Sequence, residues 1–432
     1  MRVLLTCDTL VRRSGSQAYL RDVAVGLRRA GHEPVVYSPE MGEVAEDLKR
    51  ATVPVVSDLT GLGAPPDFVH GNHHAELMTA LLRFPRAVGL HVCHAWFAPE
   101  AHPPRFPRLR RYVAVDETVR DRLISEEGIP PDRVRVILNP VDLSRFPIRP
   151  PLPTCPRTAL LFSNYAGETT HLPAVREACE RTGLELTVLG AGVGRVVENP
   201  EELLVNADLV FAKARSALEA LVSGAAVILC DATGSGPLVT ARDFAALRRR
   251  NLGIRTLDRP LTAEALVGEI ARYDAADAVE TSRLARESAS LEKIVGELVA
   301  VYEEALEEEA AAGFPDREAE ERAAADYVRW LDRMHLSARG WTAAAVDAER
   351  RAAGDRVAAA LEAERRLARE REAGATETLR HATRSLAETE AEVAWMRGSA
   401  TWRLRERVLR APGVRRAWCA FRRKARGPQE TG

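Results

Sequence analysis

The first third of the chain alternates short β-branched runs with amphipathic stretches. Between the first two runs, Leu20, Val23, Leu27 and Ala30 share one helical stripe that ends at Gly31, as in a helix closed by a glycine. A strand, loop, helix and strand of this length form a βαβ unit, and several units in series predict a parallel sheet. The predicted strands span residues 3–5, 34–37, 53–56, 68–70, 89–93, 112–115 and 134–138.

The same alternation restarts after a proline-rich segment, residues 147–156, which cannot continue a helix or a central strand. From about residue 303 the composition turns to Ala, Glu and Arg, which indicates a helical, weakly coiled-coil extension or a solvated single helix. The predicted fold class is α/β, with two Rossmann-like doubly wound domains followed by this extension. The predicted parts are a first domain (1–146), a linker (147–156), a second domain (157–302), a helical arm (303–396) and a basic tail (397–432).

Composition and charge restrict the function. The net charge is −1, yet residues 397–426 hold eleven basic side chains against the single acid Glu406. This asymmetry predicts a tail that meets an anionic surface, and the first 300 residues carry no nucleic-acid-binding signature. The six cysteines show no metal-ligand spacing, so we expect no metal site and no disulfide framework. No signal peptide or membrane-spanning run is evident, which favours a cytoplasmic protein.

Candidate chemistry falls where predicted strands end, because ligands of doubly wound sheets bind beyond the carboxyl ends of the strands. Gly15 and Ser16 follow the first strand, where a helix N-terminus can receive a phosphate, although an ordinary turn also favours these residues. Five of the ten histidines lie between residues 70 and 94. Of these, His70 and His94 are candidates for general-base or hydrogen-bonding roles, with core packing as an equal alternative.

In the second domain, Lys213 and Arg215 precede a predicted helix at the mouth of the sheet, an arrangement suited to a diphosphate. Ser216 and Glu219 also fit a capping box, which would explain both as helix-starting residues. Residues 231–237 form a glycine-rich stretch that we expect to be a loop, in which Gly234 brings backbone amides to a ligand.

Several segments, in order, resemble family 4 glycosyltransferases of the GT-B fold. They are residues 15–24, 27–33 and 34–39, then 112–121 and 136–146, and finally 216–228, which is similar to the family's Glu-Ala-x-Ala-x-Gly-x-Pro-Val block. The resemblance covers residues 1 to about 300. It implies a nucleotide sugar in the second domain and an acceptor in the first.

By this resemblance, Glu219 holds the ribose hydroxyls, the Gly15 loop contacts the donor diphosphate, and His94 lies near the donor sugar. Lys213 and Arg215 would stabilise the leaving diphosphate without a metal or other cofactor. We therefore name His94, His70 and Lys213 as catalytic candidates, and Gly15, Ser16, Lys213, Arg215, Ser216, Glu219 and Gly234 as donor-binding candidates.

The chain also departs from the family. The family's first glutamate falls at Phe211, and its Arg and Lys pair is missing from Ser163–Thr169. Lys213 and Arg215 are hypothesised to replace those cations.

The expected function is metal-independent transfer of a hexose-like sugar from a nucleotide-diphosphate sugar to a glycan or lipid-linked acceptor in bacterial surface polysaccharide synthesis. The basic tail resembles the closing segment of many bacterial enzymes of that kind. Its arginines and aromatic residues predict peripheral attachment to the inner face of the plasma membrane, with a protein partner or a solvated tail as the alternatives. We expect a second copy of the chain to associate through the helical arm and expect no nucleic-acid partner. The alternatives are an inactive GT-B scaffold and a nucleotide-sugar epimerase.

Overall fold

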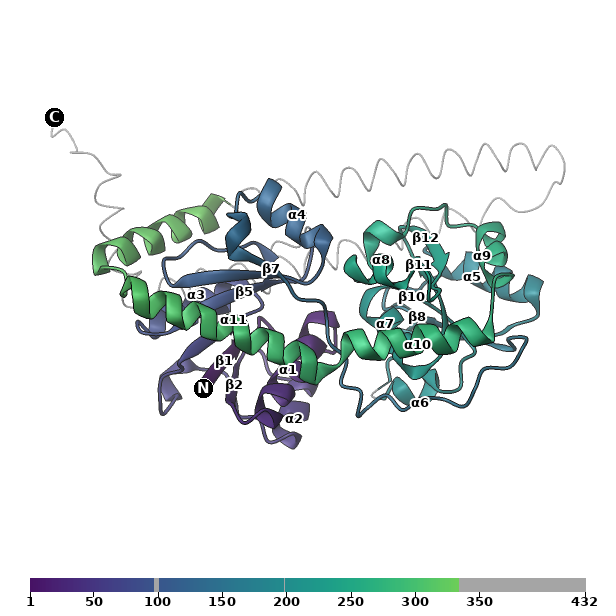
Figure 1. Ribbon diagram of the computed structural model, residues 1–432, viewed down its shortest axis with the longest axis horizontal. Coiled ribbons are helices and arrows are strands. Elements are labelled where there is room, and N and C mark those ends of the chain that lie inside the picture. The colour runs from purple at the N-terminus through teal and green to yellow at the C-terminus, as the bar shows by residue number, and fades with distance from the viewer. Residues whose placement is uncertain (97–100, 198, 334–432) are drawn as a thin grey trace, which may run out of the picture. The chain divides into compact units, whose positions relative to one another are not determined.

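The computed structural model describes residues 1–96, 101–197 and 199–333 (Figure 1). Residues 1–103 and 108–314 form one compact unit, which contains both sheets. The other unit includes a helix over residues 317–333, which begins beyond Asp316, whose carboxylate accepts the backbone N–H of Ala319. Most of the predicted arm and the whole basic tail lie outside the described residues.

The first sheet has seven parallel strands in the order β3-β2-β1-β4-β5-β6-β7. Its central strands are buried along nearly their whole length, as expected of a parallel sheet covered on both faces. The strands are β1 (Arg2–Thr6), β2 (Glu33–Tyr37), β3 (Val55–Val56), β4 (Phe68–Gly71), β5 (Val88–Cys93), β6 (Leu109–Ala114) and β7 (Val134–Val136). The helices are α1 (Gly15–Arg29), α2 (Glu43–Arg50), α3 (His74–Arg83) and α4 (Glu117–Ser125).

The second sheet has the order β12-β11-β10-β8-β9, in which all neighbours are parallel except β11 and β12. Its strands are β8 (Thr158–Phe162), β9 (Glu185–Leu189), β10 (Leu209–Ala212), β11 (Ala226–Asp231) and β12 (Gly234–Leu238). The helices are α5 (Leu172–Thr182), α6 (Glu201–Leu204), α7 (Ala214–Ser223), α8 (Phe244–Arg249), α9 (Ala263–Ile270) and α10 (Ala275–Ala289). Short 3-10 helices span Leu59–Gly61, Pro131–Arg133, Ala191–Val193 and Ile254–Thr256. The predicted fold class, two Rossmann-like α/β halves, is confirmed.

Two local predictions were wrong. The glycine-rich stretch 231–237 is not an open loop, because Gly234–Leu238 pairs with β11 as an antiparallel strand. The capping box is absent as well: α7 begins at Ala214 with Lys213 as its N-cap, so Ser216 lies inside the first turn. A short return strand and an earlier helix start both depend on backbone pairing with distant segments, which a local pattern does not carry.

Helix α11 (Leu291–Ala312) leaves the second half of the unit and packs on the first sheet (Figure 1). The Tyr302 ring stacks on Phe68 of β4 with 4.6 Å between ring centroids. Gly26 of α1 lets the two helices approach, since a Cβ there would lie 2.7 Å from Val295 Cγ2. The predicted domain boundary at residues 302 and 303 therefore falls inside α11, and residues 291–312 are part of the first sheet's covering layer.

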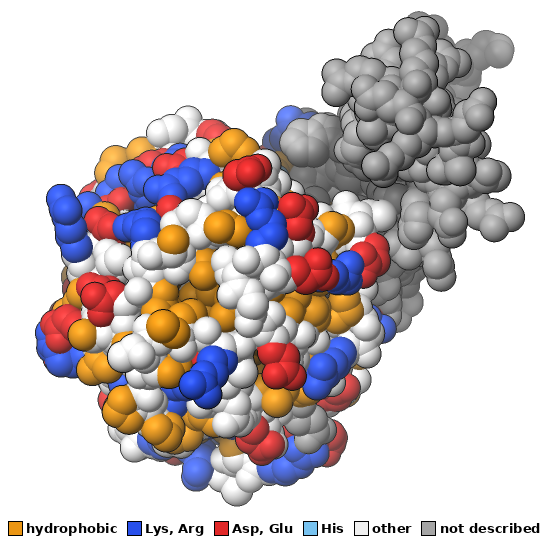
Figure 2. All heavy atoms as spheres, turned by 90° about the vertical axis from the view of Figure 1, so that its right-hand side faces the viewer, with side chains coloured by type: hydrophobic (Ala, Val, Ile, Leu, Met, Phe, Trp, Pro, Cys, Tyr) orange, Lys and Arg blue, Asp and Glu red, His pale blue; other side chains and the backbone are white. Residues whose placement is uncertain are grey.

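One end of the compact unit carries α5 and α9, and Figure 2 faces that end. Basic and acidic side chains are interspersed there among apolar ones, with neither sign of charge dominant. This face is therefore unlike the single-signed surface that a nucleic acid would require. Within the described residues, no helix is both long enough and apolar enough to span a bilayer.

Candidate active site

His70 lies on β4 and is fully buried. Its Nδ1 is 2.6 Å from the Tyr302 hydroxyl of α11, and burial lowers the pKa of the imidazole to about 3. The neutral ring thus joins α11 to the first sheet. These contacts explain His70 as a core residue, and its expected catalytic role stays a prediction.

His94 follows β5 and is half-buried, with its ring edge-on to Tyr19 of α1 at 4.6 Å between centroids. Burial lowers the pKa of His94 well below its usual value, and the nearby His73, His70 and Arg215 lower it further. The imidazole is therefore neutral near pH 7. Its Nε2 is buried and has no partner among the described residues, so it is free to bond a ligand hydroxyl.

Arg215 and Glu219 are joined on α7 rather than directed separately at a donor. Arg215 Nε donates to Glu219 Oε1 at 2.8 Å, and Arg215 Nη2 also pairs with Asp22 of α1. Arg21 lies 2.8 Å from the same aspartate. Burial raises the pKa of Glu219, and the Arg215 guanidinium opposes that rise by favouring the carboxylate. This buried network links α7 of the second half with α1 of the first.

Lys213 stands at the end of β10 and pairs with Asp231, which ends β11. Its Nζ lies 5.8 Å from the centre of the Tyr165 ring, in the turn after β8. His171 is the N-cap of α5. Burial is the main cause that lowers the pKa of its imidazole, while the nearby Asp231 carboxylate raises that pKa and the Lys213 ammonium lowers it. Three strand ends of the second sheet therefore meet at Lys213.

The backbone around Lys213 is unusual. Ala214 adopts φ +53°, a left-handed conformation that costs a non-glycine residue about 1–3 kcal/mol. The Ala214 N–H donates to the carbonyl of Leu252, which is also left-handed at φ +53°. Strain of this kind persists where the surroundings fix it, and here it falls on the first residue of α7, directly after Lys213.

The two candidate glycines, Gly15 and Gly234, differ in exposure and in how closely they are packed. Gly15 is the first residue of α1, it is exposed, and a Cβ there would meet nothing within 4 Å; Ser16 follows it half-buried. Gly234 is buried in β12 at φ +159°, and a Cβ there would come within 3.1 Å of the Arg259 carbonyl. Close backbone packing thus accounts for Gly234, whereas the start of α1 remains accessible.

The departures from the family pattern lie close to Lys213. Phe211 is fully buried on β10 in the apolar core, so this position presents no carboxylate. The segment Ser163–Thr169, which carries no cation, includes the Tyr165 ring that lies near the Lys213 ammonium. Lys213 therefore supplies positive charge beside the turn where the family has its Arg and Lys pair.

Several of these side chains have buried polar atoms without hydrogen-bond partners, as do others elsewhere among the described residues. The atoms on these side chains are Arg215 Nη1, Asp231 Oδ1, both ring nitrogens of His171 and His94 Nε2. Because buried polar groups in native proteins are almost always hydrogen-bonded, the neighbouring atoms of Asp231 and His171 indicate a place for a polar ligand or ordered water.

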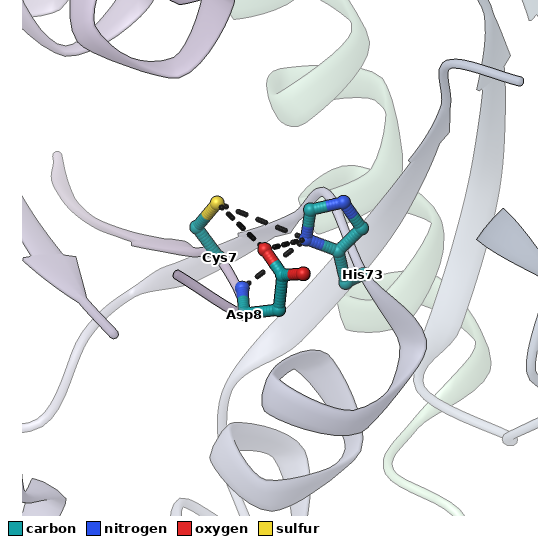
Figure 3. A group of neighbouring side chains, drawn as sticks. All are labelled: Cys7, Asp8 and His73. Carbon is teal, nitrogen blue, oxygen red and sulfur yellow. Dashed lines mark hydrogen bonds and ion pairs between the residues drawn. The ribbon is translucent and has the colours of Figure 1, made fainter. Parts of the chain in front are cut away.

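Sequence reasoning did not find Tyr19, Asp22 or His171, and it included Asp231 only as the first residue of the glycine-rich stretch 231–237. Asp231 had a usable signal, because it directly follows the continuous apolar run 226–230. Asp22 also had one, as an acid in a helix whose other face is apolar. Sequence reasoning also missed a cluster beside the first sheet, in which Cys7 and Asp8 follow β1 and His73 follows β4 (Figure 3).

Known proteins resemble this chain in sequence and in fold. Residues 13–145 match the family model described as Glycosyltransferase Family 4. Over these residues the chain is therefore similar to family 4 glycosyltransferases. A glycosyltransferase from Rickettsia africae superposes with a TM-score of 0.52 at 15% identity, covering 71% of this chain and 98% of the other. Anabaena Alr3699/HepE in complex with UDP superposes with a TM-score of 0.50 at 15% identity, covering 70% of this chain and 100% of the other. These likenesses show the GT-B fold. Comparison with curated proteins gave no match.

Proposed function

We propose that this family 4-like protein transfers a sugar from a nucleotide-diphosphate sugar to a glycan or lipid-linked acceptor. The observation that carries the proposal is the convergence of Lys213, Asp231 and His171 at the strand ends of the second sheet, where polar atoms of Asp231 and His171 have no partner among the described residues. The solved complexes of Anabaena HepE with UDP, and with UDP and glucose, support UDP as the first nucleotide to test.

In this proposal Lys213 exchanges its contact with Asp231 for the donor diphosphate. Its side chain is one-quarter exposed, so a phosphate can reach the ammonium. The charge that develops on the leaving diphosphate would then be met by Lys213 rather than by a bound cation. His94 would donate or accept a hydrogen bond at the donor sugar as a neutral imidazole.

The test is a panel of nucleotide-diphosphate sugars, with binding followed by thermal shift and transfer followed by release of the nucleoside diphosphate. A donor at a hundred times its Kd should stabilise the protein by about 2.7 kcal/mol. Removing a charge-assisted contact worth about 1.5–3 kcal/mol, as in Lys213→Ala, should weaken donor binding about tenfold to hundredfold.

Lys49→Ala is the matched control, because Lys49 also pairs with one carboxylate, at 2.7 Å from Glu46. It should bind the donor like wild type. Equal binding by Lys213→Ala and wild type would refute the role of Lys213, and a panel without any binding would refute the donor site.

An inactive scaffold is the second candidate, and two observations favour it. Phe211 occupies the position of the family's first glutamate, and Arg215 is already engaged by Glu219 and Asp22. Donor binding without transfer or hydrolysis would identify this case. Interconversion of donor epimers without an acceptor would instead identify an epimerase.

We further propose that the basic tail, residues 397–426, brings the enzyme to the acceptor at an anionic membrane surface, as surface polysaccharide synthesis would require. About 1 kcal/mol per basic side chain near such a surface makes this attraction strong at low salt. Sedimentation of the full chain with anionic vesicles, compared with a chain ending at residue 396, tests the proposal. Equal sedimentation of the two chains would contradict it.

A further inference from the structure

Cys7, Asp8 and His73 form a compact group at the carboxyl ends of β1 and β4, away from Lys213 in the sequence and on the other sheet (Figure 3). Cys7 Sγ is 3.5 Å from Asp8 Oδ1 and 3.7 Å from His73 Nδ1. Asp8 Oδ1 and His73 Nδ1 are 3.0 Å apart. Three different ligand atoms, a sulfur, an oxygen and a nitrogen, therefore face one point.

The triangle has the size of one face of a tetrahedral zinc site. Zinc bond lengths of about 2.3 Å to sulfur and about 2.0–2.2 Å to nitrogen and oxygen place tetrahedral ligand atoms about 3.4–3.6 Å apart. The three measured separations lie within about 0.4 Å of that range. Small side-chain rotations would close the remaining difference.

The chemistry of the three ligand atoms and their exposure to solvent restrict which metal ion can bind. A cysteine sulfur with an imidazole suits zinc and disfavours magnesium or calcium, which prefer oxygen alone. Cys7 is fully buried and His73 nearly so, whereas the Asp8 side chain is one-quarter exposed and opens the group to solvent. Three protein ligands with one accessible side match a zinc ion that keeps a fourth position for water or substrate.

We propose that Cys7, Asp8 and His73 bind a zinc ion in the first domain. Binding releases the proton of the Cys7 thiol, which now donates to the Thr9 carbonyl at 3.3 Å, and replaces the hydrogen bond from the Asp8 N–H to His73 Nδ1. The expected ion lies on the half of the molecule to which the acceptor is assigned, so it would bind or polarise acceptor groups rather than the donor diphosphate.

Cobalt substitution tests this proposal independently of transfer activity. Full-length protein, stripped with chelator, is titrated with Co²⁺ and then with Zn²⁺ as a competitor. Wild type should take up one equivalent of Co²⁺ with the visible bands of tetrahedral cobalt and a near-ultraviolet thiolate charge-transfer band, and Zn²⁺ should abolish both.

Cys7→Ser should lose the charge-transfer band, and Asp8→Asn should weaken Co²⁺ binding by more than about tenfold. Cys93→Ser is the matched control, since Cys93 is a fully buried cysteine at the end of β5 and should leave the spectrum unchanged. Melting curves establish that each variant is folded, and the partly exposed Asp8 provides a variant that spares the core.

A wild-type protein without the cobalt bands overturns the proposal, as does an unchanged spectrum in folded Cys7→Ser and Asp8→Asn. In either case the three side chains are a hydrogen-bonded group only. Because the readout is spectroscopic, failure here is separate from failure of donor binding at Lys213.

Discussion

Arg215 offers the sharpest test of the buried ion network between α7 and α1. Its guanidinium contacts Glu219 and Asp22, and the side chains of the three residues are 10%, 11% and 1% exposed. In Arg215→Leu the alkyl volume is largely kept while both carboxylates lose their cation. Asp22 retains Arg21 at 2.8 Å, so the uncompensated charge falls mainly on Glu219.

Removing one partner of a buried ion pair costs about 3–5 kcal/mol, because the other charge stays buried. At roughly 2 °C per kcal/mol for a unit of this size, the melting temperature should fall by about 6–10 °C. Adding Glu219→Gln to Arg215→Leu removes the stranded charge and should recover part of this loss. Differential scanning calorimetry of the three proteins measures each step.

Arg283→Leu provides the control, because Arg283 of α10 also pairs with two carboxylates, Glu280 and Glu287, but at the surface. Water screens such pairs, so this variant should melt close to wild type. Equal melting temperatures for the two leucine variants, or no recovery in the double variant, would show that burial does not set the strength of the network.

Two further predictions concern α11 and its contacts. The pKa of His70 is about 3 in the folded protein and roughly 6.5 in the unfolded chain. The contribution of His70 to the free energy of unfolding is therefore complete above about pH 6.5 and is lost as the pH falls toward 3. His70→Gln should reduce the slope of unfolding free energy against pH between 6 and 4 by about 1.4 kcal/mol per unit in urea titrations; an unchanged slope would contradict this. Gly26→Ala should destabilise by about 1–3 kcal/mol because Val295 blocks the new methyl group, whereas Gly296→Ala on α11, with nothing within 4 Å, should stabilise by about 0.5–1 kcal/mol. Loss of stability in both alanine variants would refute the steric argument.

Much of the fold is readable from the sequence because parallel strands buried on both faces appear as continuous apolar runs. The stripe that ends at Gly31 became α1, and Gly31 has φ +84° as the predicted closing glycine. The pattern could not show that β12 pairs back on β11, since Gly234 carries no side chain to mark a strand face. Nor could it show that α11 returns to the first sheet, which is decided by distant packing of Tyr302 on Phe68.

The candidate site was predictable in its location and only partly in its contacts. Lys213 was found because a cation at a strand end is conspicuous, and Glu219 was found through the family resemblance, but Asp22 and Asp231 were not paired with them. An ion pair between residues 193 positions apart, such as Arg215 and Asp22, leaves no local signature. The sequence argument treated Lys213 and Arg215 as equivalent cations, and the structure separates them into an accessible one and a buried one.

This separation bears on how the two halves of the protein communicate. Arg215 lies two residues after Lys213 and shares its helix start with the strained Ala214, while its guanidinium reaches Asp22 on α1. A diphosphate that draws Lys213 away from Asp231 would act on the same helix start that anchors this cross-contact. Tyr19, one turn before Asp22 on α1, lies against His94. Arg215 and its neighbour Lys213 in the second half are therefore joined to His94 of the first half by one short chain of contacts through α7 and α1. This chain gives a physical route between the proposed donor site and the proposed acceptor side.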